Sequence, residues 1–103
     1  MTLGTTVRLS DAAYADLIRL DDFLWLQGDP LAGNLLDFAL DALKILELQP
    51  AIGRPVELSL RELIISRGRS GYLAKYSYHR PSKLVRVLRI RHQRESGYID
   101  SDI

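Results

Sequence analysis

Hydrophobic and polar residues alternate near the start of the chain. Val7 and Leu9 lie on one side of the alternation, and Thr6 and Arg8 lie on the other. A period of two residues is typical of a strand with one buried face. We therefore predict a short strand over residues 5–9.

The pattern then changes to a helical spacing. Ser10 can accept hydrogen bonds from the free amides of a first helical turn that carries Asp11. Apolar residues follow at intervals of three and four residues, which places them on one helix face. This stripe consists of Ala13, Leu17, Leu20 and Leu24, widened by Ile18 and Trp25.

Gly28, Asp29 and Pro30 indicate the end of this helix and the start of another. Glycine favours a left-handed helix end, aspartate favours the N-cap and proline favours the first helical position. We predict a second helix over residues 30–48, with its buried side formed by Leu31, Leu35, Phe38, Ala42, Ile45 and Leu46. Pro50 ends it, so the two helices form a hairpin.

Three strands are predicted in the second half, over residues 60–66, 72–78 and 84–92, because these runs are rich in apolar, β-branched and aromatic residues. The turns at 68–71 and 79–83 are short enough to join antiparallel neighbours. The expected fold is α+β: a short N-terminal strand, a two-helix hairpin, then a three-stranded antiparallel meander. The helices can bury their stripe only against one face of the sheet, which leaves the other face open.

The last strand carries most of the interesting chemistry. Simple alternation places Leu88, Ile90 and His92 on one face, and Arg89 and Arg91 on the other face together with Val87. Arg86 interrupts a clean alternation, so we expect a bulge, an exposed edge or a later strand start. Tyr72, Tyr76 and Tyr78 share one face of the preceding strand, and we expect them to pack against the helices.

Length and composition limit the possibilities. A chain of 103 residues is expected to form one domain, over residues 1–103, with 95–103 as a flexible tail. It contains no cysteine, which excludes disulfides and thiolate metal sites and suits a reducing cytoplasm. No signal-peptide pattern or membrane-spanning apolar run is present. We expect a cytoplasmic protein that does not enter a membrane and holds no metal or other cofactor.

The net charge of +1 conceals an uneven distribution. Residues 1–52 contain three Lys/Arg and eight Asp/Glu, a net charge of −5, whereas residues 53–103 contain eleven and five, a net charge of +6. This asymmetry suggests an anionic partner for the second half, although strongly basic strands can also be merely solvated.

Six short segments occur in a distinctive order along nearly the whole chain. They are VRLS at 7–10, DP at 29–30, QPAIGRP at 49–55, LREL at 60–63, YLAKY at 72–76 and VRVLRIRH at 85–92. With a helix hairpin before the meander, they resemble the RelE/ParE toxin superfamily, which includes plasmid stabilisation proteins. The resemblance implies the toxin of a type II toxin–antitoxin system, held inactive in a heteromeric complex with a cognate antitoxin.

Within this superfamily, the RelE branch cleaves mRNA on the ribosome and the ParE branch inhibits DNA gyrase. RNA cleavage needs a general base, a general acid and cations that stabilise the charged phosphorane. The candidates for proton transfer are His92, Tyr98 and Glu62. A structural role is the leading alternative for both His92 and Tyr98, the first at a strand end and the second covering an apolar gap.

The segments around 53–55, 60–63 and 88–92 look more like the ParE branch, so we expect a non-enzymatic inhibitor of gyrase. The arginines expected to bind the target or antitoxin are Arg61, Arg69, Arg89, Arg91 and Arg94. Arg89 and Arg91 are expected at the surface, where alanine substitution leaves the fold intact. The alternatives are an mRNA endonuclease and a non-toxic interaction module that shares the fold.

Overall fold

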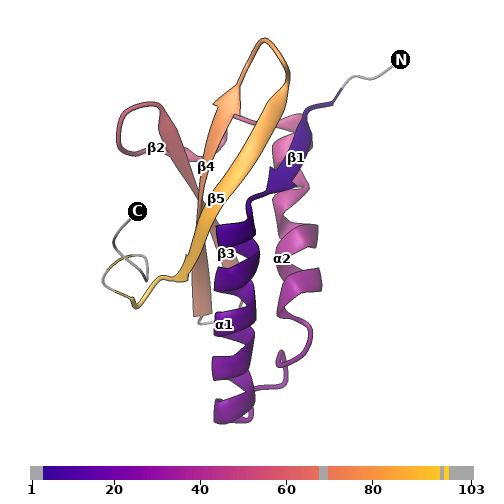
Figure 1. Cartoon of the computed structure of the whole chain (residues 1–103), viewed down its shortest axis with the longest axis vertical. Helices are drawn as coiled ribbons and strands as arrows, with labels where there is room; N and C mark the ends of the chain where they lie inside the picture. The colour runs from indigo at the N-terminus through magenta and orange to yellow at the C-terminus, as the bar shows by residue number, and fades with distance from the viewer. Residues whose placement is uncertain (1–3, 68–69, 96, 98–103) are drawn as a thin grey trace.

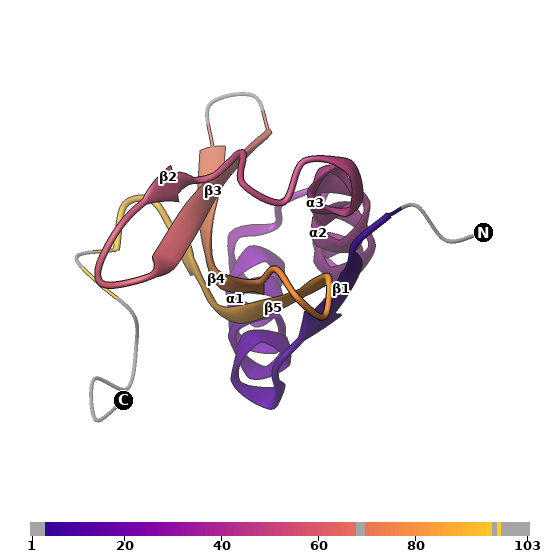
Figure 2. The ribbon, with the colours of Figure 1, turned by 90° about the horizontal axis from the view of Figure 1, so that it is seen from above.

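The computed structural model describes residues 4–67, 70–95 and 97, without the side chains of residues 67 and 70. A mixed sheet forms one layer and the helices form the other, on one side of that sheet (Figures 1 and 2). The elements in chain order are β1 (Thr6–Leu9), α1 (Asp11–Gln27), α2 (Leu35–Leu43), α3 (Ile45–Leu48), β2 (Arg54–Pro55), β3 (Leu60–Arg67), β4 (Ser70–His79) and β5 (Leu84–His92). The predicted α+β fold, with its helices before the meander, is confirmed.

The sheet has five strands in the order β1-β5-β4-β3-β2. β3, β4 and β5 form the predicted antiparallel meander, and the short β2 pairs antiparallel with β3 at one edge. β1 pairs with β5 in parallel at the other edge, with Val7 opposite Val85. The first strand therefore completes the sheet beside the last one, as Figure 1 shows.

α1 begins and ends at the predicted residues. The Ser10 hydroxyl accepts a hydrogen bond from the Ala13 amide at 3.0 Å, and Gly28 ends the helix with a φ of 66°. The predicted stripe from Ala13 to Leu24 is buried. Ile18 and Trp25, expected to widen it, are instead 65% and 63% exposed, because each follows the buried residue before it by about 100° around the helix.

The second helix begins later than predicted. The Asp29 carboxylate does accept a hydrogen bond from the Leu31 amide at 2.8 Å, but this forms a local turn. Gly33 then has a φ of 88°, which is not a helical conformation, and α2 begins at Leu35. A further break at Lys44 separates α2 from the single-turn α3. The spacing of apolar residues did not reveal these breaks, because it continues through both of them.

A β-bulge in β5 is the feature that most changes the expected faces. Lys75 pairs with Arg89 while Tyr76 pairs with Val87, so Leu88 is the extra residue. The bulge reverses the alternation, and Val87 and Ile90 therefore both pack in the core on the helix side. A bulge was one of the three alternatives expected for this strand, but the assignment of Val87 to the face opposite Ile90 was wrong.

The core lies between the sheet and the helices. Its fully buried large side chains are Tyr76, Leu35, Leu43, Leu46, Ile90, Val85 and Val87. Tyr72 is also buried and Tyr78 packs against the core, as expected for tyrosines on the helix face. Within the described part of the chain, no helix combines the length and apolar character needed to cross a membrane.

Candidate functional site

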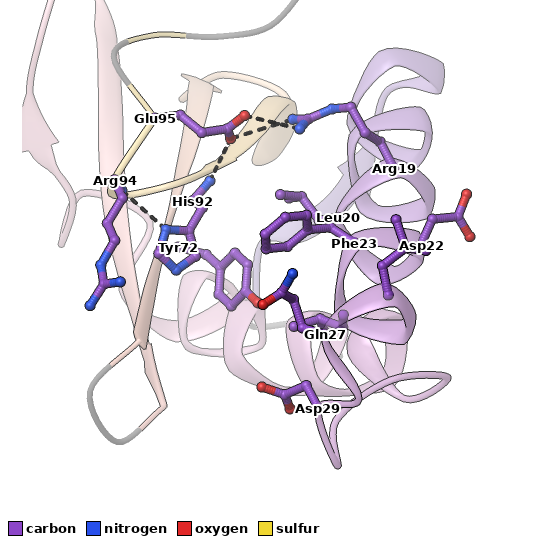
Figure 3. Close-up of a pocket in the computed structure, with 12 residues that line it drawn as sticks. Arg19, Leu20, Asp22, Phe23, Gln27, Asp29, Tyr72, His92, Arg94 and Glu95 are labelled. Atoms are coloured by element: carbon purple, nitrogen blue, oxygen red, sulfur yellow. Dashed lines mark hydrogen bonds and ion pairs between the residues drawn. The ribbon is translucent and has the colours of Figure 1, made fainter.

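A cavity of about 660 Å³ opens where β5 ends beside the second half of α1 (Figure 3). Two features define it: apolar side chains from the helix, and polar side chains from the segment that leaves the sheet. Its lining residues are Arg19, Leu20, Asp22, Phe23, Leu24, Leu26, Gln27, Asp29, Tyr72, His92, Arg94 and Glu95. Two of the sequence-predicted site residues, His92 and Arg94, thus meet here.

His92 is held by its neighbours in one orientation. The Tyr72 ring meets it edge to face, with the ring centroids 5.3 Å apart, and the Arg94 amide donates a hydrogen bond to Nδ1 at 3.1 Å. Burial lowers the pKa of His92, Arg94 lowers it further, and Glu95 opposes the shift. The lowered pKa favours the neutral imidazole, and in that form Nδ1 accepts the Arg94 amide hydrogen bond while Nε2 carries the proton.

Glu95 fastens the segment after β5 to α1. Its carboxylate accepts hydrogen bonds from the Arg19 guanidinium at 2.9 and 3.5 Å and from the His92 amide at 2.9 Å. Arg91 in turn donates to the Glu95 carbonyl oxygen. These contacts come from both layers, as Figure 3 shows for Arg19 and His92. They fix the wall of the cavity opposite the helix.

Arg89 is not the exposed cation that the sequence suggested. It is only 8% exposed, and its Nε and Nη2 donate to the two carboxylate oxygens of Asp16 at 2.8 and 3.0 Å. The same carboxylate accepts the Ile90 amide at 2.8 Å. Beyond the end of β1, a carboxylate of α1 thus accepts the hydrogen bonds that the edge of β5 donates. Arg89 is buried at this edge. The expectation that Arg89 lies at the surface is therefore wrong.

Arg61 and Glu62 lie near the other edge of the sheet, where β3 pairs with β2. Arg61 donates to the carbonyl oxygens of Ala51 and Gly53 at 3.2 and 2.8 Å. The buried Glu62 accepts a hydrogen bond from Arg54 at 2.7 Å. Both candidates therefore hold residues 51–55 against β3, and neither reaches the cavity that His92 lines.

The strand register separates the two described candidates for proton transfer. Glu62 pairs with Lys75, and Lys75 pairs with Arg89, so these three share the face of the sheet away from the core. His92 pairs with Tyr72 on the helix side. The remaining candidates, Tyr98 and Arg69, lie outside the described residues.

Sequence reasoning missed three residues that shape this site: Asp16, Arg19 and Glu95. A signal for Asp16 was present, since it lies at helical spacing between Ala13 and Leu20 on a stripe that is otherwise apolar. A carboxylate at such a position needs a buried partner. For Arg19 and Glu95 no such signal exists, because their contact spans 76 residues of sequence.

The second half of α1 exposes three large apolar side chains. Phe23, Trp25 and Leu26 lie within one turn of the helix, and they are 57%, 63% and 82% exposed. Large apolar side chains that are exposed close together are often covered by a protein partner. The arrangement can therefore bind a protein partner. Among the residues that the structure describes, no group of three or more histidines and carboxylates is arranged to hold a metal ion.

Comparison with known proteins agrees with this architecture. A family model described as the ParE toxin of type II toxin–antitoxin systems, parDE, matches residues 7–97. A chain of the chromosomal ParDE toxin–antitoxin system from P. aeruginosa has 24% sequence identity and a TM-score of 0.67, covering 85% of this chain and 95% of that chain. A chain of the toxin–antitoxin complex RelBE2 from Mycobacterium tuberculosis has 20% identity and a TM-score of 0.61, covering 92% and 98%. At such identities the two structures show a shared fold. No curated protein matches the chain in sequence.

Proposed function

The chain belongs to the ParE toxin family of type II toxin–antitoxin systems, and from this premise we propose that it inhibits DNA gyrase by binding rather than by catalysis. A cognate antitoxin keeps it inactive in the cytoplasm by covering its exposed surfaces. The chain requires neither a metal nor another cofactor for this role.

The state of His92 is the observation that carries the non-enzymatic mechanism. A general base must accept a proton, but the free lone pair of this imidazole receives the Arg94 amide hydrogen bond. Glu62 cannot replace it, because Glu62 is paired with Arg54 and lies on the opposite face of the sheet. Two groups on opposite faces cannot act as base and acid on one phosphodiester.

The exposed apolar side chains of α1 support the proposal of an antitoxin partner. Phe23, Trp25 and Leu26 expose large apolar surfaces to water, which is costly unless a partner covers them. Both similar structures come from toxin–antitoxin systems, which agrees with a partner of that kind. We expect the neighbouring gene to encode a small antitoxin with a DNA-binding part and an amphipathic segment.

Expression of the chain alone in a bacterial host tests the proposal. We expect growth arrest, relaxation of a reporter plasmid and intact mRNA, with growth restored by the antitoxin. The variant His92→Gln should remain toxic, because no proton passes through residue 92. Normal growth at confirmed expression would contradict the toxin role. Rapid mRNA cleavage that disappears in His92→Gln would instead favour the ribosome-dependent endonuclease.

A further inference from the structure

Two arginines from opposite ends of the chain lie side by side on the face of the sheet away from the core. The parallel register of β1 and β5 pairs Arg8 with Arg86, and both are exposed. Neighbouring strands are about 4.8 Å apart, so the two side chains leave the backbone from adjacent positions on one face. Like charges in directly opposed positions destabilise a sheet. Folding therefore gives no reason for this pair.

Most other charges on this face are compensated within the fold. Arg89 pairs with Asp16, Lys75 with Glu57, and Glu62 with Arg54. Within residues 4–67 and 70–95, by contrast, no carboxylate forms an ion pair with Arg8 or Arg86. The structure thus pairs Arg89, Lys75 and Arg54 with carboxylates and leaves Arg8 and Arg86 for an external anion.

The turn between β4 and β5 adds two more cations at the same end of the sheet. The Thr6 amide donates to the Lys83 carbonyl oxygen at 2.9 Å, which places this turn beside β1. The side chains of Lys83 and Arg80 are exposed, and the Arg80 guanidinium lies 5.8 Å from the centre of the Tyr78 ring. No Asp or Glu occurs anywhere between positions 62 and 95 of the sequence. We call Arg8, Arg80, Lys83 and Arg86 the basic end. Arg8 and Arg86 lie on the face away from the core, and Arg80 lies beside Tyr78 on the helix side, so positive charges surround this end of the sheet.

We propose that the basic end binds the phosphate backbone of duplex DNA. A protein segment would need apolar anchor sites, yet none of the large apolar side chains exposed in the described part of the chain lies on β1, β4 or β5. A single strand would need aromatic rings on which to stack its bases. The exposed large aromatic side chains Tyr14, Phe23 and Trp25 are all on α1. A duplex needs neither, because it presents phosphates and keeps its bases stacked inside.

This surface is separate from the cavity at His92, so the proposal stands apart from the choice of toxin target. Binding of the purified chain to a fluorescein-labelled 20-base-pair DNA duplex, followed by anisotropy at several salt concentrations, tests it. Four phosphate contacts predict a slope of log K against log salt of about −3.6. Arg86→Gln should reduce the slope by about 0.9 and weaken binding roughly eightfold at 0.1 M salt. Arg8→Gln should do the same.

Lys44→Gln is the matched control, because it removes one positive charge from an exposed side chain on the helix layer. It should leave the salt slope unchanged. The double variant Arg8→Gln/Arg86→Gln should melt at the same temperature as the parent or higher, since it removes a like-charge contact. Equal weakening by Lys44→Gln and Arg86→Gln would overturn the proposal. So would tighter binding of a labelled polyglutamate peptide, or of single-stranded RNA, than of the duplex.

Discussion

Replacement of Asp16 by alanine tests whether the contact between α1 and β5 holds the fold together. The Asp16 carboxylate accepts three hydrogen bonds, two from Arg89 and one from the Ile90 amide, and both charged side chains are more than nine-tenths buried. Removing one member of a buried ion pair leaves a charge without its counterion in the interior. The typical cost is about 3–5 kcal/mol. Domains of this size are stable by only about 5–15 kcal/mol, so Asp16→Ala should remove a large share of the free energy of unfolding.

Urea denaturation followed by circular dichroism measures this loss. Asp41→Ala is the control, because Asp41 forms an exposed pair with Lys44 at 3.5 Å that should contribute only about 0.5 kcal/mol. The double variant Asp16→Leu/Arg89→Met should recover part of the stability, since an apolar pair can replace a buried ion pair at little cost but leaves the Ile90 amide without its acceptor. If Asp16→Ala proved no more destabilising than Asp41→Ala, the reasoning on the buried pair would be refuted.

Three further predictions concern the core, a turn and pH. Tyr76→Phe should lower the free energy of unfolding by about 1–3 kcal/mol, because the Tyr76 hydroxyl donates to Pro50 and accepts the Gly53 amide at 2.8 and 2.9 Å; urea denaturation measures the loss, and an unchanged midpoint would contradict it. Gly33→Ala should cost about 1–2 kcal/mol by the same assay, since Gly33 has a φ of 88° and its added Cβ would lie 3.2 Å from the Trp25 ring. The folded state lowers the pKa of His92 below its ordinary value of 6.5, so the contribution of this residue to stability should be complete above pH 6.5 and lost as pH falls through the lower folded pKa. Unfolding curves at pH 7.5 and 5 should therefore show a smaller loss at pH 5 for His92→Gln than for the parent, and an equal loss would contradict the shift.

Local signals predicted much of this fold. The cap at Ser10, the left-handed end at Gly28 and the alternating meander strands all depend on neighbouring residues, and each was located correctly. The start of α2 was predicted too early, because the apolar spacing runs unbroken across Gly33. The backbone conformation of Gly33 is not helical, so α2 begins only after it. A pattern of side chains does not report where a glycine turns the chain.

The candidate site was less predictable, because distant pairings decide which cations are exposed. Arg89 lies 73 residues from Asp16, and its burial depends on a bulge that moves it relative to Val87. The sequence did not indicate Arg8 as a binding residue, because it lies in the half of the chain with net negative charge. The parallel pairing of β1 with β5 places it beside Arg86. Sequence patterns identified the basic strand but not which arginines the fold itself uses.

A gyrase supercoiling assay on the purified chain tests the central claim most directly. Relaxed plasmid, gyrase and ATP are incubated with increasing amounts of the chain, and a parallel sample follows the cleavage of ribosome-bound mRNA. We expect supercoiling to stop with both the parent and His92→Gln, and the mRNA to stay intact, because Nδ1 of His92 already accepts the Arg94 amide hydrogen bond. Full supercoiling together with mRNA cleavage that is lost in His92→Gln would contradict it.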